Sequence, residues 1–94
     1  MKASVLDVIV ARQSEAHTRG VLNMWTVYDR PRDFPDSSHV ARRFECGGGH
    51  TEPVATRDVI KGDLPAIRDA LSRCGLVCLS RNDSDEPQIV ESWV

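Results

Sequence analysis

The stretch of residues 58–80 has the clearest pattern of apolar positions in the chain. Four apolar residues within it recur at the spacing of a single helical stripe. Asp63 can cap the first turn of this helix, and Gly75 can adopt the left-handed conformation that ends it. The apolar run 76–79 that follows is typical of a strand buried on both faces. The predicted helical stripe consists of Leu64, Ile67, Leu71 and Cys74.

Alternating apolar and polar positions predict strands on both sides of this helix. Residues 24–28 are aromatic and β-branched and form the first strand, 40–46 form the second, and 58–61 form a short third. After the helix, 76–79 and 88–94 are joined by a polar turn and should pair as an antiparallel hairpin. The predicted fold class is therefore α+β: one antiparallel sheet of four or five strands in the order ββ(β)αββ, with a single helix on one face, in two layers.

A single helix covers only one face of a sheet, so the strand patterns decide which side chains remain on the other face. In the last strand Glu91 is unsuited to burial, and keeping it exposed also places Ile89 and Trp93 on the uncovered face. In the second strand, Val40 and Phe44 are expected to face the helix. The residues predicted to form a binding surface on the uncovered face are Trp93, Ile89, Arg43, Trp25 and Tyr28.

The first part of the chain differs from the rest. Its apolar residues near Ile9 could form two helical turns, but the polar residues that follow add no support, and so short a helix is marginal. We therefore expect residues 1–23 to be a loosely ordered N-terminal arm and residues 24–94 to be one small α+β domain. An alternative interpretation takes Met24 as the natural start of the chain.

The composition narrows the possible partners and location. The chain has 94 residues, 12 basic against 14 acidic, and its formal charge of −2 gives no overall attraction to nucleic acid. Three cysteines are an odd number for a disulfide framework and suit reduced thiols in the cytoplasm. The longest apolar run is interrupted by Asp7 and is far shorter than the ~20 residues that span a bilayer. We expect a cytoplasmic protein without a membrane partner.

Five blocks of the chain carry a resemblance: MWTVYDRPRDFPD, HVARRFE, DVIKGDLPAIRDAL, GLVCLSRN and DEPQIVESWV. They resemble the successive blocks of a family of small uncharacterised bacterial proteins that begin with Met-Trp-Thr-Val-Tyr-Asp. The resemblance covers Met24 to Val94 and leaves residues 1–23 outside it. It implies membership of that family and no particular activity.

Arginine and aromatic residues gather around the loop between the first two strands. Such a surface on an open sheet can stack and clamp single-stranded RNA. Asp29, Asp33 and Asp36 would neutralise the arginines if the loop were only a solvated connection. The residues concerned are Arg30, Arg32, Arg42 and Arg43 with Trp25, Tyr28 and Phe34.

Two pairs of soft ligands, Cys46 with His50 and Cys74 with Cys78, have the residue types of a zinc site. The paired Cys-x-x-Cys spacings of strong zinc sites are missing. Cys74 and Cys78 also fall in a helical stripe and a predicted buried strand, where a free cysteine serves as a small apolar residue. We expect no metal and no other cofactor.

The residue types of a hydrolytic triad occur at Asp36, Ser37, Ser38 and His39, but adjacent residues in a loop rarely present a triad. A chain of this size also has little volume for an enclosed pocket of ~300 Å³ or more. We therefore expect a non-catalytic binding or assembly module that acts through the uncovered sheet face or an edge strand. Its partner would be a second copy, forming a homo-oligomer, or another protein. A small nucleic-acid-binding domain is the alternative, and a zinc protein is a further one.

Overall fold

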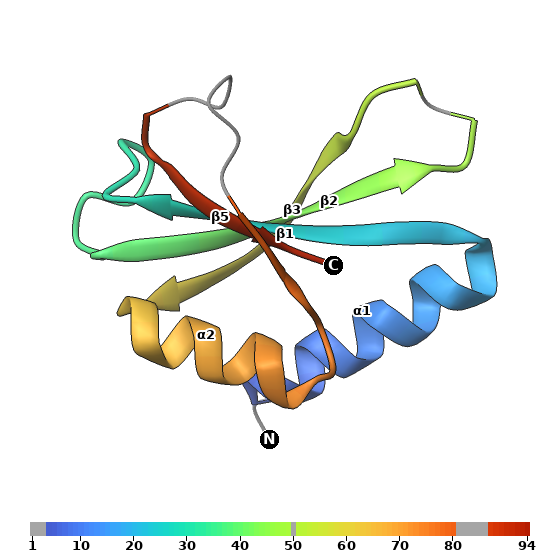
Figure 1. Cartoon of the computed structure of the whole chain (residues 1–94), viewed down its shortest axis with the longest axis horizontal. Helices are drawn as coiled ribbons and strands as arrows, with labels where there is room; N and C mark the ends of the chain where they lie inside the picture. The colour runs from blue at the N-terminus through green and yellow to red at the C-terminus, as the bar shows by residue number, and fades with distance from the viewer. Residues whose placement is uncertain (1–3, 50, 81–86) are drawn as a thin grey trace.

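The computed structural model describes residues 4–49, 51–80 and 87–94, and within them the chain forms one five-stranded antiparallel sheet and two helices. The strand order is β3-β2-β1-β5-β4, and both helices lie on the same face of the sheet (Figure 1). The predicted α+β class and antiparallel sheet are confirmed, whereas the single helix is wrong. The elements are α1 Val5–Arg19, β1 Val21–Asp29, β2 His39–Gly47, β3 Val54–Gly62, α2 Leu64–Arg73, β4 Cys78–Leu79 and β5 Ile89–Trp93.

Helix α2 begins and ends where the sequence predicts. The Ala66 N–H donates a 2.9 Å hydrogen bond to Asp63 Oδ1, which caps the first turn. At the other end Gly75 has φ +83°, and the Leu76 N–H donates to the Leu71 carbonyl at 3.2 Å. The buried stripe of the helix is made by Ile67, Ala70 and Leu71.

Helix α1 is the element that the sequence analysis missed. Ser4 and Asp7 form a reciprocal capping box, and Gly20, at φ +70°, ends the helix after four turns. Only Ile9 and Ala16 are buried, which is too narrow an apolar stripe to stand out in the sequence. Polar contacts complete its attachment: Arg12 Nε donates to Asp58 on β3 at 3.0 Å, and Arg19 to Glu45 on β2 at 2.7 Å.

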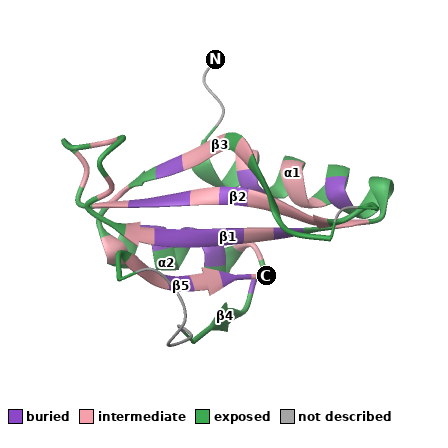
Figure 2. Cartoon of the chain, turned by 90° about the horizontal axis from the view of Figure 1, so that it is seen from above, coloured by how far each residue is buried: buried purple, intermediate pink, exposed green. Residues whose placement is uncertain are grey.

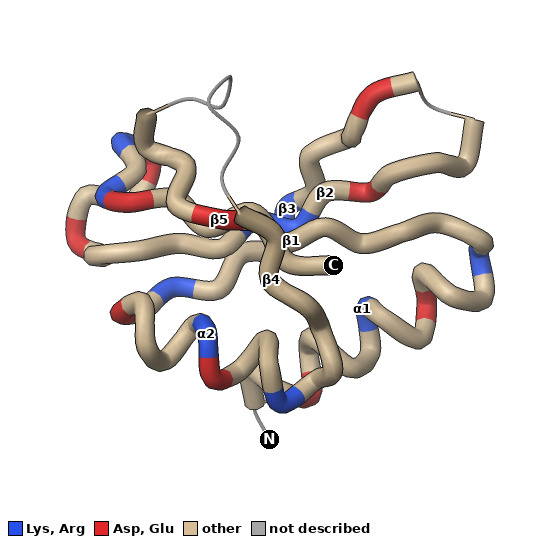
Figure 3. Tube along the Cα trace, viewed as in Figure 1, with Lys and Arg blue, Asp and Glu red and all other residues tan. Residues whose placement is uncertain are grey.

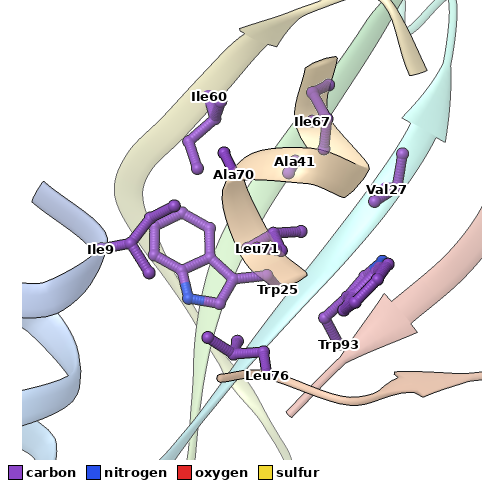
Figure 4. Close-up of a cluster of buried hydrophobic side chains, with 10 residues drawn as sticks. All are labelled: Ile9, Trp25, Val27, Ala41, Ile60, Ile67, Ala70, Leu71, Leu76 and Trp93. Atoms are coloured by element: carbon purple, nitrogen blue, oxygen red, sulfur yellow. The ribbon is translucent and has the colours of Figure 1, made fainter. Parts of the chain in front are cut away.

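The core lies between the sheet and the two helices. Trp25 and Ile9 are fully buried, and Figure 4 shows the Trp25 ring beside Ile9 of α1, with Leu71 of α2 close by. Because α1 supplies a core residue, residues 5–19 pack into the same hydrophobic core as the sheet. The cluster consists of Ile9, Trp25, Val27, Ala41, Ile60, Ile67, Ala70, Leu71, Leu76 and Trp93.

The C-terminal part of strand β5 has the opposite face inward from the one predicted, whereas Ile89 lies on the predicted face. Trp93 is only 8% exposed and belongs to the core, so its predicted position on the uncovered face is wrong. Glu91 is buried as well, because Arg68 of α2 and the Trp93 Nε1–H both donate to it at 2.7 Å. The hydrogen bond from Arg68 lowers the pKa of Glu91 below its ordinary value, although burial acts to raise it.

Strand β2 is reversed in the same way. Arg43 is 7% exposed and faces the helices, so its predicted open-face position is also wrong. Its guanidinium donates to Asp58 at 2.8 Å, and to Asn23 and Glu45 at 2.9 Å each. Burial acts to lower the pKa of Arg43, but the hydrogen bonds to Glu45 and Asp58 outweigh it and the pKa is raised. An arginine can therefore be buried here because neighbouring strands supply its acceptors.

The strand that follows α2 is an edge strand and not a doubly buried one. Leu76 is buried, but Val77 and Leu79 are 63% and 46% exposed, and β4 pairs only with β5 among the described strands. Figure 2 shows the buried residues concentrated on the central strands, with β4 exposed at the margin.

Candidate binding site on the open sheet face

The sheet face opposite the helices, called the open face from here on, carries a pocket of about 420 Å³. Tyr28 of β1 lies in it and pairs across the sheet with Val40 of β2 and with Ile89 of β5. Of the five residues predicted to form a binding surface, Tyr28 and Ile89 are on this face. The pocket is lined by Tyr28, Pro31, Arg32, Asp33, Phe34, Val40, Arg42, Phe44, Ala55 and Gln88.

A bulge explains why Ile89 and Trp93 lie on opposite faces. The two residues are four apart, which would place them on the same side of a regular strand. The pairing with β1 shifts between Val27 and Tyr28, where Val27 faces Glu91 but Tyr28 faces Ile89. Ile89 therefore joins Tyr28 on the open face, while Trp93 stays in the core.

The loop from Arg30 to Ser38 forms the raised wall of the pocket. The Arg30 N–H donates to the Ser38 carbonyl at 2.9 Å, which closes the base of the loop. The Asp29 N–H donates to the Gln88 carbonyl at 2.8 Å, which fixes the loop to the start of β5. Arg30 itself has φ +46°, in the left-handed region that residues other than glycine rarely adopt.

Apolar and charged groups lie next to one another around the pocket. Val40, 2% exposed, lies between Tyr28 and Lys61 in the strand pairing. Phe34 approaches from the loop, and the Lys61 ammonium lies 4.4 Å from the centroid of its ring. Arg42 donates to the Thr56 carbonyl at 2.9 Å and lies 3.8 Å from an Asp33 carboxylate oxygen.

A second hollow of about 310 Å³ adjoins the first. It is lined by Arg30, Pro31, Arg32 and Gln88, three of which also line the larger pocket. Arg30 and Arg32 are exposed and make no ion pair within the described part of the chain. Figure 3 shows Lys or Arg and Asp or Glu positions close together along this loop, so the surface is mixed in charge.

The predicted arginine and aromatic surface is thus assembled in part. Arg32, Arg42, Tyr28 and Phe34 line one pocket and Arg30 lines its neighbour, whereas Arg43 and Trp25 are buried under the helices. Sequence analysis missed the pocket residues Val40, Phe44 and Ala55. Arg42 was the signal in the sequence that this face is open, because an arginine does not suit a strand face that was expected to be buried.

The described residues do not assemble the suggested zinc ligands. Cys46 lies on β2 and Cys78 on β4, with β1 and β5 between these strands, and Cys74 follows the end of α2. His50 lies outside the described residues. Among those described, no three His, Cys, Asp or Glu side chains are grouped as metal ligands. Burial raises the pKa of all three thiols, which disfavours a reactive thiolate.

Ser38, His39 and Asp29 form a chain of contacts that resembles a hydrolytic triad in residue types. His39 Nδ1 lies 3.0 Å from Ser38 Oγ, and His39 Nε2 lies 3.6 Å from Asp29 Oδ1. The Ser38 hydroxyl has one proton, and the Gly62 carbonyl, 3.2 Å away, competes with His39 Nδ1 to accept it. A hydroxyl shared with a backbone carbonyl in this way is poorly placed to be activated as a nucleophile. Asp36, which the sequence analysis named, has no part in these contacts. The contacts link the end of β1 at Asp29, the start of β2 at His39 and the end of β3 at Gly62.

The chain matches no protein-family model, no curated protein and no solved structure. The resemblance of Met24 to Val94 to a family of small bacterial proteins therefore stays a prediction. In the described parts of the chain, neither helix has both the length and the apolar character needed to cross a membrane.

Proposed function

We propose that the protein is a small non-catalytic binding module whose open face receives a segment of a partner protein. The observation that carries the proposal is the open-face pocket, with its wall of Tyr28, Phe34, Phe44 and other apolar residues. Its volume of about 420 Å³ falls within the range of sites that hold a small group or a large side chain. An apolar side chain of the partner would fill it.

The shape of the face favours a protruding segment over a second copy of the chain. In a symmetric dimer the same patch meets itself, so a patch must be self-complementary. Here the loop 30–38 stands beside the hollow, so a symmetric dimer would fill the hollow only if the loop of each copy entered the hollow of the other. An extended segment or a loop of another protein can instead insert one side chain.

Ala55 offers a direct test, because it lines the pocket from the edge strand β3 and is exposed. Ala55→Trp should occupy part of the pocket and obstruct it without altering the core. Val54→Trp is the matched control, since Val54 is the adjacent exposed residue and does not line the pocket. A displayed library of random linear peptides would be selected against the wild type and both variants.

Peptides that share one large apolar residue are expected to be enriched on the wild type and on Val54→Trp, and lost on Ala55→Trp. Equal enrichment on all three proteins, or none on the wild type, would overturn the proposal. Sedimentation equilibrium over a concentration series should show a monomer. A dimer that Ala55→Trp dissociates would assign the face to a second copy instead.

Single-stranded nucleic acid is the second candidate, because Arg32 and Arg42 do line a pocket with Tyr28 and Phe34. The carboxylate of Asp33 in the same pocket and the net charge of −2 disfavour it. Labelled dT and rU 12-mers would decide between the two. Binding that falls steeply with salt and disappears in Ala55→Trp would favour nucleic acid.

A further inference from the structure

We infer that the partner segment carries Asp or Glu side chains beside its apolar anchor, and that Arg30 and Arg32 bind those carboxylates. This inference rests on the proposed function and adds the chemistry of the partner. It starts from the hollow next to the pocket, which is lined by Arg30, Pro31, Arg32 and Gln88. A segment that fills the apolar pocket would therefore extend past two guanidinium groups.

The pairing of charges around the loop leaves these two arginines available. Asp33 lies 3.8 Å from Arg42, and Asp29 lies 3.6 Å from His39. Arg30 and Arg32 make no ion pair with the residues that the structure describes. A guanidinium presents its donors in a planar fork that matches a carboxylate, so a carboxylate is the group that these side chains are suited to bind.

The backbone conformation of Arg30 also supports a binding role for its side chain. Its φ of +46° is a conformation in which glycine is the usual residue and which an L side chain rarely adopts. Replacement of Arg30 by glycine would remove no side-chain hydrogen bond or ion pair to the described residues. An arginine at such a position is therefore better explained by what it binds than by the loop it sits in.

Acidic protein segments fit this site better than a nucleic-acid strand does. Two exposed arginines can bind one or two carboxylates, whereas a nucleic-acid strand carries a continuous row of phosphates. We therefore assign the site to Asp or Glu side chains that flank an apolar residue.

The probes are two pools of acetylated and amidated hexapeptides with a central Phe, Leu or Trp. One pool has Asp and Glu at the flanking positions, and the other has Asn and Gln. Blocked ends leave side chains as the only carboxylates. Fluorescence anisotropy would measure the binding of each labelled pool to the full chain and to Arg30→Gly, Arg32→Gln and Arg57→Gln. Arg57, on β3, is exposed and lines neither pocket, so its variant controls for the loss of one charge.

The acidic pool is expected to bind the wild type about tenfold tighter than the amide pool, as charge-assisted hydrogen bonds would give. Arg30→Gly and Arg32→Gln should each reduce binding of the acidic pool severalfold and leave the amide pool unchanged, while Arg57→Gln changes neither. Arg30→Gly should also keep or raise the Tm, because glycine suits the left-handed backbone. A purely structural role for Arg30 predicts no change in binding.

The outcomes separate the inference from the proposed function. Equal binding of both pools to the wild type, lost in Ala55→Trp, would refute the acidic partner and leave the binding module intact. Binding of neither pool would count against both. If a dT or rU 12-mer displaced the acidic pool, and if its binding were weakened equally by Arg30→Gly and Arg32→Gln, the site would be assigned to nucleic acid instead.

Discussion

Ile9 provides the most direct test of the architecture, because it is the fully buried contact between α1 and the core. Ile9→Ala removes three carbon atoms from a side chain with no exposed surface and leaves a cavity beside Trp25. Such substitutions lower the free energy of unfolding by about 2–5 kcal/mol. A domain of this length has a total stability of only about 5–14 kcal/mol, so the loss would be a large fraction.

The matched control is Val10→Ala, one residue along the same helix, where the side chain is 57% exposed. Its effect should remain within about 0.5 kcal/mol. Urea unfolding followed by circular dichroism would measure both variants, and the Ile9→Ala midpoint should fall by more than 1 M for an m value of about 1–1.5 kcal/mol per M. If the two variants unfold together, α1 is not part of the core, and residues 1–23 are the loosely ordered arm that the sequence suggested.

Two further predictions concern the buried charges. Arg43→Met should lower the free energy of unfolding by about 1–3 kcal/mol, because it leaves buried acceptors unpaired. Arg57→Met, at an exposed position, should change it by less than about 0.5 kcal/mol, and urea melts that show equal losses would contradict the role of Arg43. Since the hydrogen bond from Arg68 lowers the pKa of Glu91 below the ordinary 4.5, the unfolded state takes up the proton first. The stabilisation by ionised Glu91 is complete above that ordinary value and is lost as the pH falls below it. Glu91→Gln should therefore make the Tm fall less steeply as the pH is lowered. A Tm that falls as steeply in the variant as in the wild type would contradict this.

The parts of the fold that the sequence predicts are those whose determinants are local. Helix α2 has a cap at Asp63, a left-handed stop at Gly75 and a wide apolar stripe between them, all within thirteen residues. The position of strand β1 is also predicted, although Trp25, which was expected on the uncovered face, is buried together with Val27. In each of these cases the residues that fix the structure are neighbours in the chain.

The errors have one physical cause, which is that burial of charge depends on partners distant in sequence. Arg43 and Glu91 looked unsuited to the core because charged side chains are rarely buried without a partner. Their partners are Asp58 and Arg68, fifteen and twenty-three residues away. No periodicity within one strand contains that information, so β2 and the C-terminal part of β5 were assigned the wrong face. Helix α1 was missed for a related reason, since polar contacts to β2 and β3 supply much of its attachment.

The reversal of β2 also determines what the open face is made of. Arg43 lies on the face of β2 that the helices cover, where it binds Asn23, Glu45 and Asp58 of the sheet. The alternate positions Val40, Arg42 and Phe44 therefore turn to the side that no helix covers. Val40 is almost fully buried, yet residues of the loop 30–38 and of the sheet line a hollow between them. A domain this small gains stability from every apolar group it removes from water, so an apolar hollow left beside a raised loop is a cost to the isolated chain. A partner side chain that fills the hollow would offset that cost, which is why the open face, and not the buried tryptophans, is the surface where binding is expected.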